Sequence, residues 1–191
     1  MVVPRRLHRF TYRDYVAVES ISSTKHEFLD GEIYAMDGGT EDHAALALEI
    51  LRSFAAAVEE RPCRALGSDL RIYVESVGLA TFPDGSVICG PLAQHPAGPE
   101  STALNPCVLL EVTSDSSEEY DTTEKLEAYL TIPTLRTYVI VAHRERRITV
   151  HARGEDGAWT TSAATSGARI AIASLATELV VDTVYRKTSI A

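Results

Sequence analysis

The sequence lacks the features that mark several common protein classes. It contains no run of about 18 apolar residues, the length that a membrane-spanning helix needs. The opening stretch MVVPRRLHRFTYRDY carries charge where a secretory signal has its apolar segment, so we expect a cytoplasmic protein. There is no GxGxxG, GxxxxGK[ST] or GxSxG motif, which argues against the usual dinucleotide-binding, P-loop and α/β-hydrolase sites.

Cysteine is also scarce. Cys63, Cys89 and Cys107 lie far apart, form no CxxC pair and are odd in number. This pattern argues against a disulfide scaffold or a zinc ribbon. We favour three buried cysteines that act as small apolar residues.

Positive charge is in short supply, with 18 Lys and Arg against 27 Asp and Glu, which gives a net charge of −9. Non-specific coating of nucleic acid depends on Lys and Arg, so the balance argues against that function. It leaves room for an enzyme that holds phosphates in one local groove. Carboxylates gathered around a metal would themselves add to the acidic excess.

What is present indicates one globular domain spanning residues 1–191, with 45% apolar and 24% charged residues. Residues 10–22 predict a short helix or arm, and Asp30-Gly31 predicts a tight turn between strands at 25–29 and 32–36. A long amphipathic helix is expected over 40–60, capped by Thr40. Its apolar positions at helical spacing are Ala44, Leu48, Leu51, Ala55 and Val58.

The rest of the chain alternates strands with one further helix. Short strands are expected over 63–67, 69–74 and 80–89, the last interrupted by Pro83-Asp84-Gly85, and a surface loop is expected over 90–106. A buried strand over 107–112 precedes a helix from a Ser116-x-x-Glu119 capping box to about residue 130. A hairpin at 135–152 and two or three short strands follow. The order predicts an α/β fold with a mixed central β-sheet flanked by helices, plus extra β-hairpins.

A group of charged residues indicates chemistry. Asp84 lies within a predicted strand and Glu111 ends the buried run Val108–Leu110, and the 26 residues between them allow their strands to become neighbours. Asp121 and Lys125 are four residues apart and share a helix face. Two carboxylates at strand ends with a nearby amine suit metal-dependent phosphodiester hydrolysis, because the carboxylates hold the cation and the amine orients the attacking water.

Pro83-Asp84 followed by Glu111-Val112-Thr113 resembles the PD-(D/E)xK nuclease superfamily, except that Thr113 stands where that pattern has lysine. A narrower resemblance, to the Uma2-family restriction endonucleases, covers most of the chain. In that family the lysine has moved to the following helix, which corresponds to Lys125. Gly85 replaces the family's usual hydrophobic residue, and Ser114-Asp115-Ser116 replaces its SPS. The matching stretches are HEFLDGEIYAM (26–36), GSDLRIYV (67–74), TFPDGSVICG (81–90) and LLEVTSDSSEEYDTTEKLEAYLTIPTLRTYVIV (109–141).

The resemblance implies a restriction-endonuclease-like fold and a DNA endonuclease dependent on Mg²⁺ or Mn²⁺. Asp84 and Glu111 would bind the metal with the main-chain carbonyl of Val112, and Glu27 would add a carboxylate. Lys125 would lie beside the attacking water, and His43 would contact the scissile phosphate or carry a proton. The expected partners are DNA and a second copy of the chain in a homodimer. Arg71 and Asp121 complete the predicted site as substrate-binding residues.

Each assignment has a structural alternative. Asp84-Gly85 could be a plain turn, Glu111 could simply pair with Lys125, and Asp121 with Lys125 could be an exposed helix pair. Arg71 could pair with Asp69 or another acid. The arginines at 144, 146 and 147 could contact DNA, but their place in a predicted hairpin turn favours a solvated loop. His43 and Glu27 could face solvent.

Two rival functions stay open: a catalytically silent or regulatory binding module, and a hydrolase of a smaller phosphodiester. A cation held by Asp84 and Glu111 would favour the nuclease, whereas a Glu111–Lys125 salt bridge without a cleft would favour the module.

Overall fold

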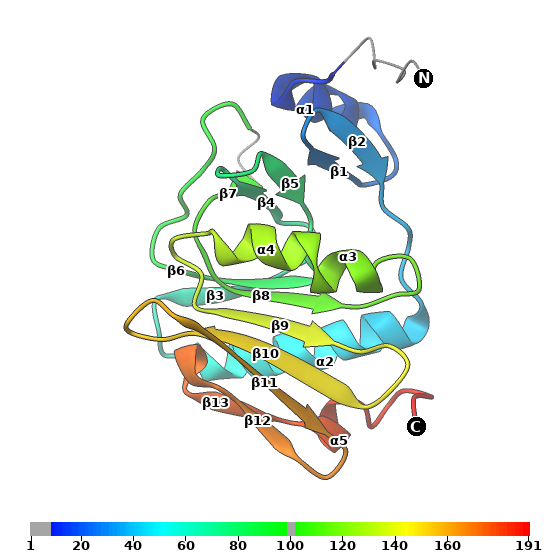
Figure 1. The fold of residues 1–191 in the computed structure, drawn as a ribbon, viewed down its shortest axis with the longest axis vertical. Helices are drawn as coiled ribbons and strands as arrows, with labels where there is room; N and C mark the ends of the chain where they lie inside the picture. The colour runs from blue at the N-terminus through cyan, green and yellow to red at the C-terminus, as the bar shows by residue number, and fades with distance from the viewer. Residues whose placement is uncertain (1–8, 99–101) are drawn as a thin grey trace, which may run out of the picture.

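The computed structural model describes residues 9–98 and 102–191 (Figure 1). Residues 1–8, which begin the charged N-terminal stretch, and residues 99–101 of the surface loop expected over 90–106 lie outside the described residues. The elements in chain order are α1 (Tyr12–Ile21), β1 (His26–Leu29), β2 (Glu32–Ala35), α2 (Glu41–Ala57), β3 (Cys63–Gly67), β4 (Arg71–Val74), β5 (Leu79–Thr81), β6 (Gly85–Cys89), β7 (Thr102–Ala103), β8 (Pro106–Val112), α3 (Glu118–Thr122), α4 (Glu124–Leu130), β9 (Thr137–Val141), β10 (Arg147–Arg153), β11 (Trp159–Thr165), β12 (Arg169–Ile172), the 3₁₀ turn η1 (Ala173–Leu175), β13 (Thr177–Val180) and α5 (Val181–Val184).

A six-stranded mixed sheet with the order β11-β10-β9-β8-β6-β3 forms the centre of the fold. Its strands pair antiparallel except for β8 and β9, which are parallel and are joined through α3 and α4. In Figure 1, α3 and α4 lie on one side of this sheet and α2 on the other. Each side has its own apolar core, built around α2 on one face and around α4 on the other. The expected α/β class with a mixed central sheet is confirmed.

The long helix α2 lies where the sequence predicted it, but a different face is buried. Thr40 caps the helix, since its side chain accepts a hydrogen bond from the His43 backbone N–H at 3.2 Å. Leu46, Ile50 and Phe54 are fully buried, and each contributes about 1.5–3 kcal/mol of hydrophobic stabilisation. The expectation that Leu48 belongs to the buried face is wrong, because that side chain is 69% exposed.

A second sheet, with the order β2-β1-β5-β4-β7, carries the predicted first hairpin. Its turn is confirmed at Asp30 and Gly31, which both have positive φ angles, 48° and 82°. The interrupted strand expected over 80–89 is two strands in two sheets: β5 pairs in this second sheet and β6 in the central one. Pro83 and Asp84 form the crossing between them, which explains why a proline is tolerated there.

The helix expected after Glu111 is broken into two pieces. Thr123, with φ −126° and ψ −95°, separates α3 from α4. The capping box expected at Ser116 and Glu119 is wrong, since the N-cap is Ser117 and its side chain makes no capping hydrogen bond. The break leaves Asp121 and Lys125 on different helices.

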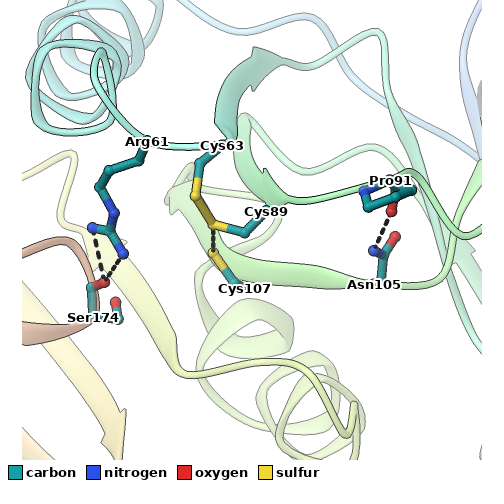
Figure 2. Close-up of a disulfide and its surroundings, with 7 residues drawn as sticks. All are labelled: Arg61, Cys63, Cys89, Pro91, Asn105, Cys107 and Ser174. Carbon is teal, nitrogen blue, oxygen red and sulfur yellow. Dashed lines mark hydrogen bonds between the residues drawn. A yellow bond between two sulfur atoms is a disulfide. The ribbon is translucent and has the colours of Figure 1, made fainter.

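The cysteines overturn another expectation. Cys63 and Cys89 form a disulfide, and Cys107 is free (Figure 2). Residues 63 and 89 are directly opposite each other in the antiparallel β3–β6 pair, so the sheet register brings together two cysteines that are 26 positions apart. The spacing of the three cysteines in the sequence does not indicate this pairing.

None of the helices within 9–98 and 102–191 has both the length and the apolar character needed to cross a membrane.

Candidate active site

Asp84 and Glu111 lie next to each other because β6 and β8 are antiparallel neighbours. Gly85 is in register with Leu110, so Asp84, one residue before β6, falls opposite Glu111. The Val112 backbone N–H donates a 2.8 Å hydrogen bond to Asp84 Oδ2, and the Asp84 N–H lies 3.4 Å from Glu111 Oε2. The sequence prediction that these two carboxylates meet at neighbouring strand ends is confirmed.

Lys125, at the start of α4, inserts its ammonium group among three carboxylates. Its Nζ lies 2.9 Å from Glu27 Oε1, 2.9 Å from Glu111 Oε1 and 3.3 Å from Asp121 Oδ1. All four side chains are 12% exposed or less, so the expected alternative of an exposed Asp121–Lys125 pair is wrong. Glu27 comes from β1 in the second sheet, and the cluster therefore joins both sheets to the α3–α4 layer.

The electrostatics of this cluster follow from three carboxylates around one ammonium group. Burial lowers the pKa of Lys125, but Glu111, Glu27 and Asp121 together raise it well above its usual value. Burial raises the pKa of Glu111 to about 8 against the opposing effect of Lys125, and burial likewise raises the pKa of Asp121. The cluster thus keeps Lys125 charged and favours added positive charge or a proton on its carboxylates.

Two neutral residues that sequence reasoning did not place in the site complete this network. Tyr129 donates a 2.8 Å hydrogen bond from its hydroxyl to Glu111 Oε1, and Thr81 Oγ1 donates to Glu27 Oε1. Tyr129 is also part of the apolar core around α4. It follows Lys125 by four residues on the same helix. This spacing in the sequence could have indicated that both side chains lie on the face directed toward Glu111.

His43, near the start of α2, contacts Asp84, which is the carboxylate that does not pair with Lys125. Its Nε2 lies 3.2 Å from Asp84 Oδ2. The hydrogen bond to Asp84 raises the pKa of His43, burial opposes this, and the carbonyl of Val112 raises it further. Gly39 leaves room for the ring, because a Cβ there would lie 2.6 Å from His43 Nδ1. His43 therefore faces Asp84 and Val112, which the family resemblance implies are metal ligands.

Removal of the Asp84 charge should be visible directly in the His43 titration. In Asp84→Asn, and in the wild type on addition of Mg²⁺, we expect the pKa of His43 to fall because its anionic partner is lost or neutralised. Two-dimensional NMR of the histidine ring protons measures this. His151, whose pKa is lowered by burial alone, is the internal control and should not move. An unchanged His43 pKa in Asp84→Asn would contradict the assigned contact.

A cavity of about 1080 Å³ opens over these residues. Its lining includes Glu27, His43, Asp84, Glu111, Val112, Asp121 and Lys125, which are all the predicted catalytic and metal-binding residues together with Asp121. The Glu111–Lys125 salt bridge that we expected of a silent module is present, but so is the cleft that this module should lack. The two observations together do not match the criterion for the silent module.

The departures from the family pattern have structural explanations. A Cβ at Gly85 would lie 2.7 Å from Leu51 Cδ2 and 3.2 Å from Leu110 Cδ2, so a larger residue there would require the Leu51 side chain to move. Thr113, which stands at the superfamily's lysine position, is buried and its hydroxyl lies 2.8 Å from His143 Nδ1. Asp115 contacts the other ring nitrogen, Nε2, at 2.8 Å. These contacts tie the 113–117 loop to the end of β9.

The structure does not bring Arg71 to the cavity. Its guanidinium lies among Tyr15, Phe82 and Thr102, donates to the Tyr15 hydroxyl at 3.1 Å, and is not among the described residues that line the cavity. The alternative pairing with Asp69 is also absent, because Asp69 pairs with Lys25 at 2.7 Å. The other basic cluster is paired as well: Arg144 contacts Asp115 and Glu118, Arg146 contacts Asp182, and Arg147 contacts Glu145.

The donor atoms fit a hard divalent cation, although no complete ligand set is preassembled. Asp84 and Glu111 offer carboxylate oxygens and Val112 a carbonyl, the ligand types preferred by Mg²⁺ and Mn²⁺. Within the part of the chain that the structure describes, no three His, Cys, Asp or Glu side chains are already arranged as a metal site. A cation here would be held by few protein ligands and completed by water, as is usual for Mg²⁺.

Comparison with known proteins shows what the chain is similar to. The sequence profile described as "Uma2: Putative restriction endonuclease" matches residues 12–183. Two Synechocystis sp. (strain ATCC 27184 / PCC 6803 / Kazusa) proteins, "Uncharacterized protein slr1290" and "Uncharacterized protein sll1609", are 31% and 26% identical. The alignments cover 91% of this chain and 90% of the first, and 83% of this chain and 89% of the second.

A solved structure shares the fold. It is described as a putative nuclease belonging to DUF820 from Anabaena variabilis ATCC 29413, with a TM-score of 0.71 and 18% identity over 86% of this chain and 92% of that one.

Proposed function

Because the chain belongs to the Uma2 family, we propose that it is a metal-dependent endonuclease that hydrolyses DNA phosphodiester bonds. The observation that carries the proposal is the meeting of Asp84, Glu111 and Lys125 in one cavity, although they come from three separate segments of the chain. The family description and the nuclease-like fold support the proposal.

The chain's own residues supply binding and orientation. Asp84, Glu111 and the carbonyl of Val112 would hold the cation, with Glu27 as an added carboxylate. When bound, the cation supplies an acidified water and offsets charge on the phosphate. Lys125 would orient the attacking water, held in place by Glu27 and Asp121. His43, which contacts Asp84, would contact the scissile phosphate or carry a proton.

The charge of the cavity explains why a cation would be required for a polyanionic substrate. Seven carboxylates line it, against the two ammonium groups of Lys25 and Lys125. Without added positive charge the cavity would repel phosphate. The lining carboxylates are Glu27, Asp37, Asp69, Asp84, Glu111, Asp121 and Glu124.

Quaternary structure belongs to the same proposal. Cleavage of both strands of a duplex needs two active centres, and a two-fold homodimer supplies them with one kind of chain. We therefore propose a homodimer for double-strand cleavage. Linearisation of plasmid without accumulation of the nicked form is the expected sign of paired centres.

A panel of phosphodiesters tests the proposed function against its rivals. The purified protein is incubated in Mn²⁺, Mg²⁺ or EDTA with supercoiled plasmid, single-stranded DNA, RNA or bis(p-nitrophenyl) phosphate. We expect metal-dependent breakage of the plasmid within the chain. Hydrolysis of the small diester alone would support the hydrolase of a smaller substrate, and no hydrolysis of any substrate would support the silent binding module.

The pH dependence of the cleavage rate should show the ionisation of the Glu111 carboxyl. This carboxyl binds a cation only when deprotonated, and burial raises its pKa to about 8. At limiting Mn²⁺ we expect the cleavage rate to fall as the pH drops below about 8. Higher Mn²⁺ should move the midpoint to lower pH, because cation and proton compete for the same oxygens. A midpoint that does not respond to the Mn²⁺ concentration would contradict this competition.

A further inference from the structure

Three sulfur atoms meet at the end of the central sheet opposite the acidic cavity. Cys89 Sγ is bonded to Cys63 Sγ and lies 3.5 Å from the free Cys107 Sγ. In Figure 2 the Cys107 sulfur lies beyond Cys89, on the side away from Cys63. Cys107 and Glu111 are four residues apart on β8, roughly 13 Å at the usual rise of a strand, so the sulfur cluster is separate from the cavity.

An irregularity in the β6–β8 ladder produces the third contact. Val87 pairs with Val108, but Ile88 pairs with Pro106, which leaves Cys107 as the extra residue of a bulge. A bulge redirects the side chain of its extra residue. Here it brings Cys107 against Cys89, whose other neighbour, Cys63, is held directly opposite by the β3–β6 register. The central cysteine therefore has a possible disulfide partner on each side.

We propose that these residues form an intramolecular thiol–disulfide exchange site, in which the disulfide moves between Cys63–Cys89 and Cys89–Cys107. The Cys107 thiol gives its proton to solvent, and its thiolate attacks Cys89 Sγ. The Cys89–Cys107 bond forms as the Cys63–Cys89 bond breaks, and the electron pair leaves on Cys63, which takes up a proton. One disulfide is lost and one is gained, so the step needs neither oxidant nor reductant.

The surroundings of Cys107 determine how readily its thiol loses a proton, and therefore how fast the exchange runs. All three cysteines are partly exposed, so solvent can take and return the proton. Burial raises the pKa of Cys107, while the nearby guanidinium of Arg61 lowers it. Only the thiolate attacks, so the rate should rise roughly tenfold per pH unit below that pKa.

The exchange changes which strands are cross-linked. In one form the bond fixes the edge strand β3 to β6. In the other form the bond fixes β6, which follows Asp84, to β8, which contains Glu111. The thiol of Cys63 at the sheet edge is then free. The site thus offers an external disulfide or electrophile either the Cys107 thiol or the Cys63 thiol, depending on the form.

Disulfide mapping tests the proposal independently of nuclease activity. The full chain, oxidised with oxidised glutathione and freed of it, is held at pH 6, 7.5 or 9 and sampled over time by acid quenching. Free thiols are alkylated with N-ethylmaleimide in denaturant at low pH, and non-reducing mass spectrometry of peptic fragments identifies the bonds. We expect both bonds in the wild type, label on both Cys107 and Cys63, and faster approach to the final ratio at higher pH.

Cys107→Ser is the matched control. It should retain the Cys63–Cys89 bond and show no label on Cys63, since the attacking thiol is missing. Cys63→Ser should form Cys89–Cys107 on oxidation, which shows that this bond fits the fold. Label confined to Cys107 in the wild type at every pH overturns the proposal, as does label on Cys63 in Cys107→Ser. A wild-type chain that forms no disulfide under the oxidising conditions also overturns it.

Discussion

Replacing Lys125 by methionine is expected to lower the free energy of unfolding by about 3–5 kcal/mol at neutral pH, because removing one partner of a buried ionic cluster leaves uncompensated charge. Lys125 is 4% exposed and lies within 3.3 Å of three carboxylates. Methionine keeps most of the side-chain volume, carries sulfur in place of the δ-methylene, and lacks the ammonium group. Urea denaturation of the two proteins measures the difference.

Lys25→Met is the matched control for this effect. Lys25 also pairs with a carboxylate, Asp69, at 2.7 Å, but its side chain is 39% exposed and that of Asp69 is fully exposed. Such surface pairs contribute about 1 kcal/mol or less. A loss in Lys125→Met no larger than that in Lys25→Met would contradict the account of the cluster.

The destabilisation by Lys125→Met should depend on pH with a defined sign. Without the ammonium, burial keeps the folded-state pKa values of Glu111 and Asp121 above their unfolded values. The folded variant then binds more protons than the unfolded chain, so its free energy of unfolding falls as the pH rises through those values. We expect the difference from the wild type to shrink between pH 8 and pH 5. A difference that grows over this range would refute the charge explanation.

Glu111→Gln is expected to reduce metal-dependent DNA cleavage by at least about 100-fold, since metal stabilisation of the transition state amounts to several kcal/mol. The variant should still fold. Glutamine resembles the protonated carboxyl that burial favours at this position, and its oxygen can still accept the Tyr129 hydrogen bond. Plasmid cleavage rates, with circular dichroism to verify the fold, measure both effects.

The control for Glu111→Gln is another acid in the same cavity. Asp69 lines the cavity but is exposed and pairs with Lys25 rather than with the Lys125 cluster. Asp69→Asn should change the cleavage rate by less than about fivefold, in keeping with a surface pair. Equal losses in both variants would indicate a general effect of cavity charge rather than a metal ligand.

The sequence predicted those parts of the site that depend on local pattern and strand ends. Glu111 ends a run of apolar residues, and Pro83-Asp84-Gly85 interrupts the strand expected over 80–89, so both carboxylates were expected at strand ends. A sheet that pairs β6 with β8 then places them opposite each other. The tight turn at Asp30-Gly31 and the Thr40 cap followed from the chemistry of single residues.

What the sequence did not reveal depends on contacts between distant segments. The Cys63–Cys89 disulfide requires the β3–β6 register, which spacing does not encode. Arg71 was assigned to substrate because it lies inside a family motif, yet its guanidinium packs against Phe82 and Tyr15 in the interior. The face of α2 was misjudged because Ala44 and Leu48 line the cavity rather than the core, and Leu51 lies between the two. Apolar residues at helical spacing occur both on a face buried in the core and on a face that lines a cavity, so the spacing does not distinguish the two.

The central claim is that a divalent cation held at Asp84 and Glu111 enables this chain to cleave DNA. Its most direct test is the initial rate of supercoiled-plasmid cleavage against free Mn²⁺ concentration, measured for the wild type and for Asp84→Asn. We predict a saturable rise for the wild type that EDTA abolishes, and no rise for Asp84→Asn at any Mn²⁺ concentration. Cleavage that is independent of Mn²⁺, or that is equal in the two proteins, would contradict the claim.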